Sequence, residues 1–118
     1  MNSKYIVAWV EDIDVSAHLA KLVTTHSFSL EFKNSVQLVQ EINSLKILII
    51  DLACIKESDL QILIELKNKK YFILIGFCEG INGPLMNYYD DLGCDIVLQR
   101  QDLLKNLDSI IDKAFHAC

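Results

Sequence analysis

The stretch LKILIIDLAC, residues 45–54, decides the fold, because it is a strand-like apolar run that ends on an acid. Five of the six residues before Asp51 are apolar, and they lack the polar–apolar alternation of a strand with one solvated face. Continuous runs of this kind are typical of parallel sheets with helices on both faces. A second such run, FILI at residues 72–75, predicts a neighbouring strand.

Short apolar runs and longer amphipathic segments alternate along the rest of the chain. Strands are expected at residues 4–10, 28–32, 45–50, 71–77 and 95–98, and helices are expected to begin near Val15, Val36, Ser58, Pro84 and Asp102. Asp14 or Ser16 is expected to cap the first helix, and Asp102 the last. Right-handed crossovers between these elements give an α/β fold, a doubly wound five-stranded parallel sheet in a (βα)5 three-layer sandwich.

Length and composition indicate one domain, residues 1–118, with a core of its own. The net charge of −5 and the absence of a basic cluster argue against nucleic acid as a partner. The first residues do not form a secretion signal, and no apolar run approaches the ~20 residues that span a bilayer, so we expect a cytoplasmic protein without a membrane partner. The four cysteines lack Cys-x-x-Cys spacing, which argues against zinc.

Acids follow two of the expected central strands. Glu11, Asp12 and Asp14 come after the first strand, and Asp51 ends the third. The carboxyl ends of parallel strands share one edge of the sheet, where ligands bind in folds of this class. Carboxylates gathered there suit Mg²⁺, and an aspartate beside Mg²⁺ can accept a phosphoryl group. Asp14 is assigned mainly to helix capping.

Three segments carry a resemblance to a known family: VEDID at residues 10–14, LIIDLAC at 48–54 and LGCDIVLQR at 92–100. In their order on the five-fold pattern, they resemble the receiver domain of two-component response regulators, a flavodoxin-like fold with strand order 2-1-3-4-5. The resemblance implies that Asp51 accepts a phosphoryl group from a histidine kinase or a phosphotransfer protein. It also implies that Mg²⁺ is held by Glu11, Asp12, Asp51 and the backbone carbonyl of Ala53.

The chain also departs from this family's pattern. Gly76 stands for the Thr or Ser that contacts the phosphoryl group, Arg100 for the Lys after the fifth strand, and Val97 for the aromatic switch residue. The spacing between the motifs is short, which predicts trimmed helices. Metal binding and phosphorylation could survive these changes, whereas the coupled switch is expected to be lost.

Three functions remain open from the sequence. The first is a stand-alone receiver, and the second is a pseudo-receiver that docks partners independently of phosphate. The third is a small haloacid dehalogenase-like phosphatase, suggested by DIDVS at residues 12–16, although Asp90 and Asp91 lie on an expected helix rather than after a strand. For both receiver alternatives we expect a downstream partner, or a homodimer, at the face of the fourth helix, fifth strand and fifth helix. The residues expected near that face are Met86, Tyr88, Tyr89 and Arg100.

Overall fold

A parallel sheet lies at the centre of the computed structural model, which describes residues 5–26 and 28–116. Strands and helices alternate throughout this part of the chain, as the sequence predicts. The elements are β1 (Tyr5–Trp9), α1 (Ile13–Thr25), β2 (Ser29–Phe32), α2 (Val36–Gln40), β3 (Leu45–Asp51), α3 (Glu57–Lys70), β4 (Ile73–Cys78), α4 (Gly83–Leu92), β5 (Ile96–Gln99) and α5 (Arg100–His116).

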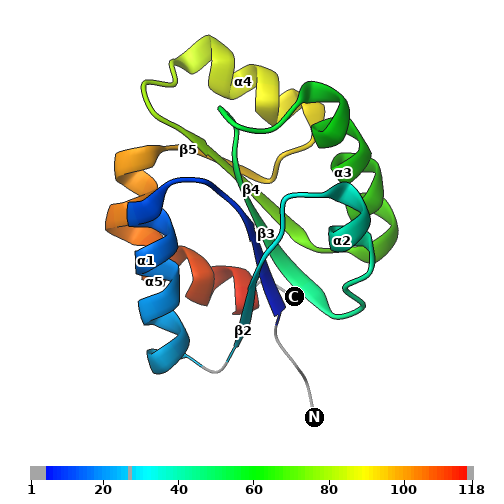
Figure 1. Ribbon diagram of the computed structural model, residues 1–118. Helices are drawn as coiled ribbons and strands as arrows, with labels where there is room; N and C mark the ends of the chain where they lie inside the picture. The colour runs from blue at the N-terminus through cyan, green and yellow to red at the C-terminus, as the bar shows by residue number, and fades with distance from the viewer. Residues whose placement is uncertain (1–4, 27, 117–118) are drawn as a thin grey trace.

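The strand order is β2-β1-β3-β4-β5, and all four pairings are parallel. Helices α1 and α5 cover one face of the sheet, and α2, α3 and α4 cover the other (Figure 1). This confirms the predicted three-layer sandwich with order 2-1-3-4-5. Because β1 and β3 are neighbours, the acids that follow them reach the same edge of the sheet.

Strand β3 shows why its sequence is continuously apolar. Every residue of this strand except Lys46 is buried. Leu48 and Ile50 pack into the core under α2, α3 and α4, while Ile47 and Ile49 pack into the core under α1 and α5. Both faces of the strand are therefore covered, so neither can be polar.

The ends of the elements differ from expectation at several places. Asp12, not Asp14 or Ser16, is the N-cap of α1, and its Oδ1 accepts from the amides of Asp14 and Val15. Asp102 does not cap α5, because that helix already begins at Arg100.

Two expected strands also begin later than predicted. Tyr71 closes α3 in a left-handed conformation with φ of 58°, so β4 begins only at Ile73. β5 begins at Ile96 because Asp95 is used in the preceding loop. Lys4, the predicted start of the first strand, lies outside the described residues.

Asp95 has a structural role that the sequence did not reveal. Its carboxylate accepts from the backbone amide of Leu74 at 2.8 Å and pairs with Lys67 Nζ at 3.1 Å. The backbone amide of Asp95 in turn donates to the carbonyl of Leu74. The acid of the LGCD segment thus joins the start of β5 to β4 and α3.

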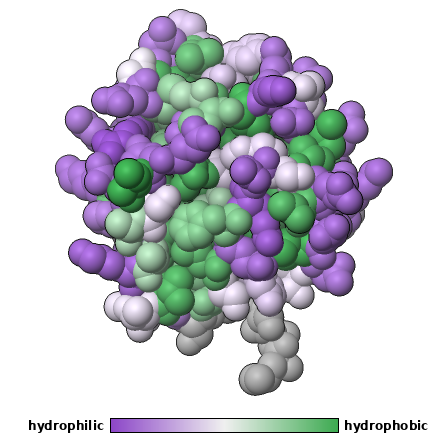
Figure 2. Space-filling view, viewed as in Figure 1, coloured by the Kyte–Doolittle hydropathy of each residue, from purple (hydrophilic) through white to green (hydrophobic). Residues whose placement is uncertain are grey.

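The two edges of the sheet are lightly covered. On the face where β2 lies, Figure 2 shows apolar surface running between hydrophilic margins, and Phe32 at the end of β2 is half exposed.

Within the described ranges, no helix has the length and apolar character of a membrane span. Cys54, Cys78 and Cys94 are free thiols, and Cys118 lies outside the described residues.

Candidate functional site: the acidic edge of the sheet

Asp51 lies at the carboxyl end of β3 and is buried, with 9% of its surface exposed. Its Oδ1 accepts from the amide of Ala53 at 3.0 Å, and its Oδ2 accepts from the thiol of Cys54 at 3.3 Å. The turn that follows the strand therefore supplies a hydrogen bond to each carboxylate oxygen. Ala53, which the resemblance makes a metal ligand through its carbonyl, is placed beside Asp51 by this turn.

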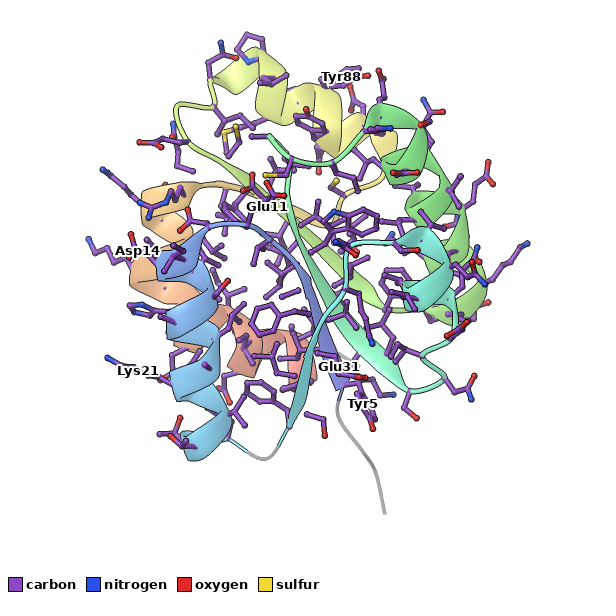
Figure 3. All side chains as sticks on the ribbon, in the orientation of Figure 1. Tyr5, Glu11, Asp14, Lys21, Glu31 and Tyr88 are labelled. Atoms are coloured by element: carbon purple, nitrogen blue, oxygen red, sulfur yellow. The ribbon has the colours of Figure 1, made fainter. Side chains whose placement is uncertain are left out.

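Glu11 follows β1 and is exposed at the middle of this edge (Figure 3). The thiol of Cys54, which donates to Asp51, also lines a pocket together with Glu11, so the two carboxylates lie close to one sulfur atom. Loss of water around the thiol and hydrogen bonding to these two carboxylates raise the pKa of Cys54 to about 12. Cys54 therefore stays protonated at neutral pH and acts as a donor between the acids.

Asp12 and Asp14 form a second group, which is held by Arg100. The Nε of Arg100 donates to Oδ2 of Asp12, and its Nη2 lies 3.2 Å from Oδ1 of Asp12 and 2.7 Å from Oδ2 of Asp14. The hydrogen bond from Arg100 lowers the pKa of Asp12, and the same bond to Asp12 raises the pKa of Arg100. Figure 3 shows Asp14 at the first turn of α1, beside the edge of the sheet.

The predicted site residues are thus divided between two clusters. Glu11 and Asp51 meet around Cys54, whereas Asp12 meets Arg100. Among the side chains that the structure describes, no three His, Cys, Asp or Glu are arranged to hold a metal ion. With a guanidinium on Asp12 and a thiol on Asp51, these side chains do not fit the octahedral oxygen shell that Mg²⁺ requires.

Gly76 does not face Asp51. It pairs with Ile50, and a Cβ added to Gly76 would lie 2.9 Å from Cδ1 of Leu52, on the side of the sheet covered by α3 and α4. Phe77 instead pairs with Asp51 and shares its face of the sheet. The β4 position paired with Asp51 therefore carries a buried phenyl ring, whereas Gly76, which stands for the Thr or Ser of the family pattern, pairs with Val97 on β5.

Phe77, Leu52 and Cys54 also lie at this edge, and the sequence indicated none of them as a site residue. Phe77 is recognised only once the register between β3 and β4 is known, because paired residues of parallel strands share a face. The contact between Cys54 and both acids carries no signal in the sequence, since it depends on how the loop after β3 turns.

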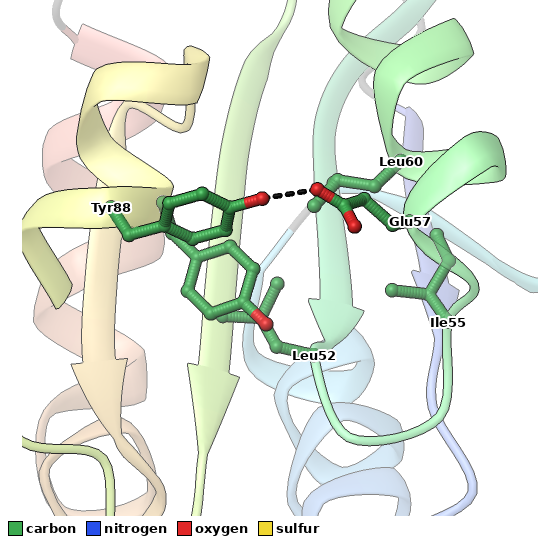
Figure 4. Close-up of a pocket in the computed structure, with 6 residues that line it drawn as sticks. Leu52, Ile55, Glu57, Leu60 and Tyr88 are labelled. Carbon is green, nitrogen blue, oxygen red and sulfur yellow. Dashed lines mark hydrogen bonds between the residues drawn. The ribbon is translucent and has the colours of Figure 1, made fainter. Parts of the chain in front are cut away.

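The expected partner face contains a contact between two helices. Tyr88 of α4 donates its hydroxyl hydrogen to Oε1 of Glu57 on α3 and packs edge-to-face on Tyr89 at 5.3 Å (Figure 4). A small cavity of about 90 Å³ lies below this contact, between the two helices. Arg100 is turned toward α1 instead.

No family model matches the chain, and no curated protein matches it by sequence. A response regulator from Thermotoga maritima matches in structure with a TM-score of 0.76 at 8% identity, covering 95% of this chain and 97% of the other. The chain has the receiver fold. Two Burkholderia proteins described as pilus assembly proteins have the same fold. The B. pseudomallei protein has a TM-score of 0.75 and 22% identity, with 99% of this chain and 92% of the other covered. The B. thailandensis protein has a TM-score of 0.73 and 20% identity, with 97% of this chain and 98% of the other covered.

Proposed function

We propose that this receiver-fold protein is an interaction module that docks a protein partner without phosphorylation of Asp51. The observation that carries this proposal is that Gly76, which stands for the Thr or Ser of the family pattern, has no hydroxyl and is packed against Leu52. In the family that the sequence resembles, a hydroxyl beside the phosphoacceptor contacts the phosphoryl group and relays the switch. Gly76 has no side chain to make that hydrogen bond, and Phe77, which pairs with Asp51, is 1% exposed in the core under α1 and α5.

The surroundings of Asp51 support the same conclusion. Each oxygen of its carboxylate already accepts a hydrogen bond from the turn after β3. On the other side of β4, Leu52 fills the space beside Gly76, which leaves no room for a moving side chain there. A phosphoryl group on Asp51 would therefore meet a packed environment without the groups that read it.

The comparisons add weaker support. Two of the matching structures are described as pilus assembly proteins rather than response regulators, and they have the same fold. A role of this chain in assembling other proteins, rather than in relaying phosphate, agrees with those names.

The partner is proposed to dock at α4 and β5. None of the residues of α4 is buried, and Leu85 and Tyr88 expose 38% and 43% of their surfaces. β5 is an edge strand whose residues are all half-buried. A downstream protein, or a second copy of this chain, would cover these apolar side chains.

Incubation with acetyl phosphate and Mg²⁺, followed by intact-mass measurement, tests the proposal. We expect no phosphoryl adduct on the wild-type protein, and a response regulator of known activity serves as the positive control. An adduct that disappears in Asp51→Asn, together with a changed oligomeric state, would overturn phosphorylation independence.

A second candidate is a phosphorelay receiver in which Asp51 accepts a phosphoryl group from a histidine kinase or a phosphotransfer protein. The convergence of Glu11 and Asp51 on the thiol of Cys54 favours it, because the acceptor then has a second carboxylate at hand. This candidate requires Arg100 to release Asp12. The phosphatase alternative gains no support, since Asp90 and Asp91 are exposed residues of α4.

A further inference from the structure

Arg100 is the only arginine in the sequence, and it lies at the acidic edge of the sheet. It is the first residue of α5 and directly follows β5, while its partners Asp12 and Asp14 lie at the start of α1. Its side chain therefore joins two helices that are distant in sequence. The remaining positive side chains of the chain are lysines, and no lysine contact with Glu11, Asp12, Asp14 or Asp51 is found among the described residues.

The contacts of Asp12 leave little capacity for another ligand. Its Oδ1 accepts from the amides of Asp14 and Val15 at 3.0 and 3.2 Å and also faces Nη2 of Arg100. Its Oδ2 accepts from Nε of the same guanidinium. A carboxylate offers about four acceptor positions, so the α1 cap and the arginine fork occupy nearly all of them.

We propose that Arg100 is the resident cation of this edge, in the place that the receiver resemblance gives to Mg²⁺. The guanidinium stays charged at every pH at which the protein is folded, and its fork matches the carboxylate of Asp12. Mg²⁺ gives up its water reluctantly, and it would have to displace both the guanidinium and the amides of the cap. The edge thus keeps one arrangement whether or not a divalent cation is present.

While Arg100 occupies Asp12, the other acids of the edge are too few to form a metal site by themselves. Glu11 and Asp14 are exposed, so water and salt screen their charges. Asp51 is buried, but the Ala53 amide and the Cys54 thiol already donate to it. This inference and the proposed docking function can fail separately. A docking module could still bind Mg²⁺, and a protein that does not bind Mg²⁺ could still lack the proposed partner.

An NMR titration of the wild-type protein with MgCl2, and then with paramagnetic MnCl2, tests the inference directly. We expect no saturable shift and no selective broadening of the amide signals of residues 10–14 and 51–54 up to millimolar metal. Saturable changes confined to these segments in the wild-type protein would overturn the inference, and this arm needs no variant.

Arg100→Ala provides the complementary test. Removing the guanidinium leaves Asp12 without its counter-ion, so the variant should gain a saturable Mg²⁺ response at the same amides. It should also melt at least ~4 °C higher when Mg²⁺ is added in large excess over its dissociation constant.

Lys105→Ala is the matched control, because it removes one positive charge from an exposed position of the same helix. This control should respond to Mg²⁺ as the wild-type protein does. A folded Arg100→Ala variant that ignores both metals would show that the acids lack a metal site for another reason, which would also overturn the role given to Arg100.

Discussion

The residues around Asp51 illustrate how a few side chains decide whether an acid is free to react. The carboxylate ends a buried strand, yet its oxygens are satisfied by Ala53 and Cys54 from the next turn. Phe77 lies beside it, and Leu52 fills the opposite side of β4 at Gly76. A side chain at position 76 would therefore compete with Leu52 for the same space, and this packing can be tested by substitution.

Gly76→Thr should destabilise the protein by about 1–3 kcal/mol, because the new Cβ would overlap Leu52 Cδ1, which lies 2.9 Å from its ideal position. In a Leu52→Ala background the space is open, and the same change should become neutral or stabilising, since glycine weakens a strand interior by roughly 0.5–1 kcal/mol. Urea unfolding of the four proteins of this double-mutant cycle measures the coupling. An equal cost of Gly76→Thr in both backgrounds would show that Leu52 is not the obstacle.

The sequence predicted where the acids lie but not how they pair. Asp51 and Glu11 were placed at one edge of the sheet because both follow central parallel strands, and the structure brings them to one thiol. The pairing of Asp12 with Arg100 depends on the rotamer of a long side chain and on the exact start of α5. The pairing of Phe77 with Asp51 was not predicted, because the register between β3 and β4 cannot be read from spacing alone.

At the scale of elements, a single residue at the start of α1 both caps the helix and forms an ion pair. Asp12 caps the helix through two backbone amides and also binds the guanidinium of Arg100 at the start of α5. The first turn of α1 is therefore fixed to α5 at the edge of the sheet. The strands themselves were predictable from their apolar runs, whereas this helix start was placed too late because Asp14 or Ser16, rather than Asp12, was expected to be the cap.

Two substitutions of Asp12 separate the cap from the charge. Asp12→Asn keeps a good capping side chain and loses the charge, whereas Asp12→Ala loses both and should be less stable than Asp12→Asn by about 1 kcal/mol. Urea unfolding at pH 7 measures this difference. Equal stabilities of the two variants would show that the cap contributes nothing.

The contribution of the charge should depend on pH in a fixed direction. Arg100 lowers the pKa of Asp12 below its ordinary value of 3.8, so the unfolded chain binds the proton more readily than the folded one. The stability advantage of wild type over Asp12→Asn should therefore be complete well above pH 3.8 and disappear as the pH falls below it. An advantage that is unchanged down to low pH would contradict the ion pair.

At the scale of the whole molecule, α4 is packed less tightly on the sheet than the other long helices. Helix α1 buries Val15 and Leu19 against the sheet, and α5 buries Leu103, Leu107, Ile111 and Ala114, whereas α4 buries none. The hydroxyl of Tyr88 on Glu57 links α4 to α3 across their shared cavity. Because few contacts hold α4, we expect it to open locally before the rest of the fold.

Native-state hydrogen exchange measures this difference between helices. Amides of α4 should exchange faster than those of α1 and α5, and Tyr88→Phe should accelerate exchange in α4 further, because it removes the link to Glu57 while keeping the ring. Tyr71→Phe is the matched control, since it removes a hydroxyl from a ring that is 86% exposed at the end of α3. Should α4 remain as protected in Tyr88→Phe as in Tyr71→Phe, packing of the tyrosine rings would be what holds the helix, and the partner face would be more rigid than its exposure indicates.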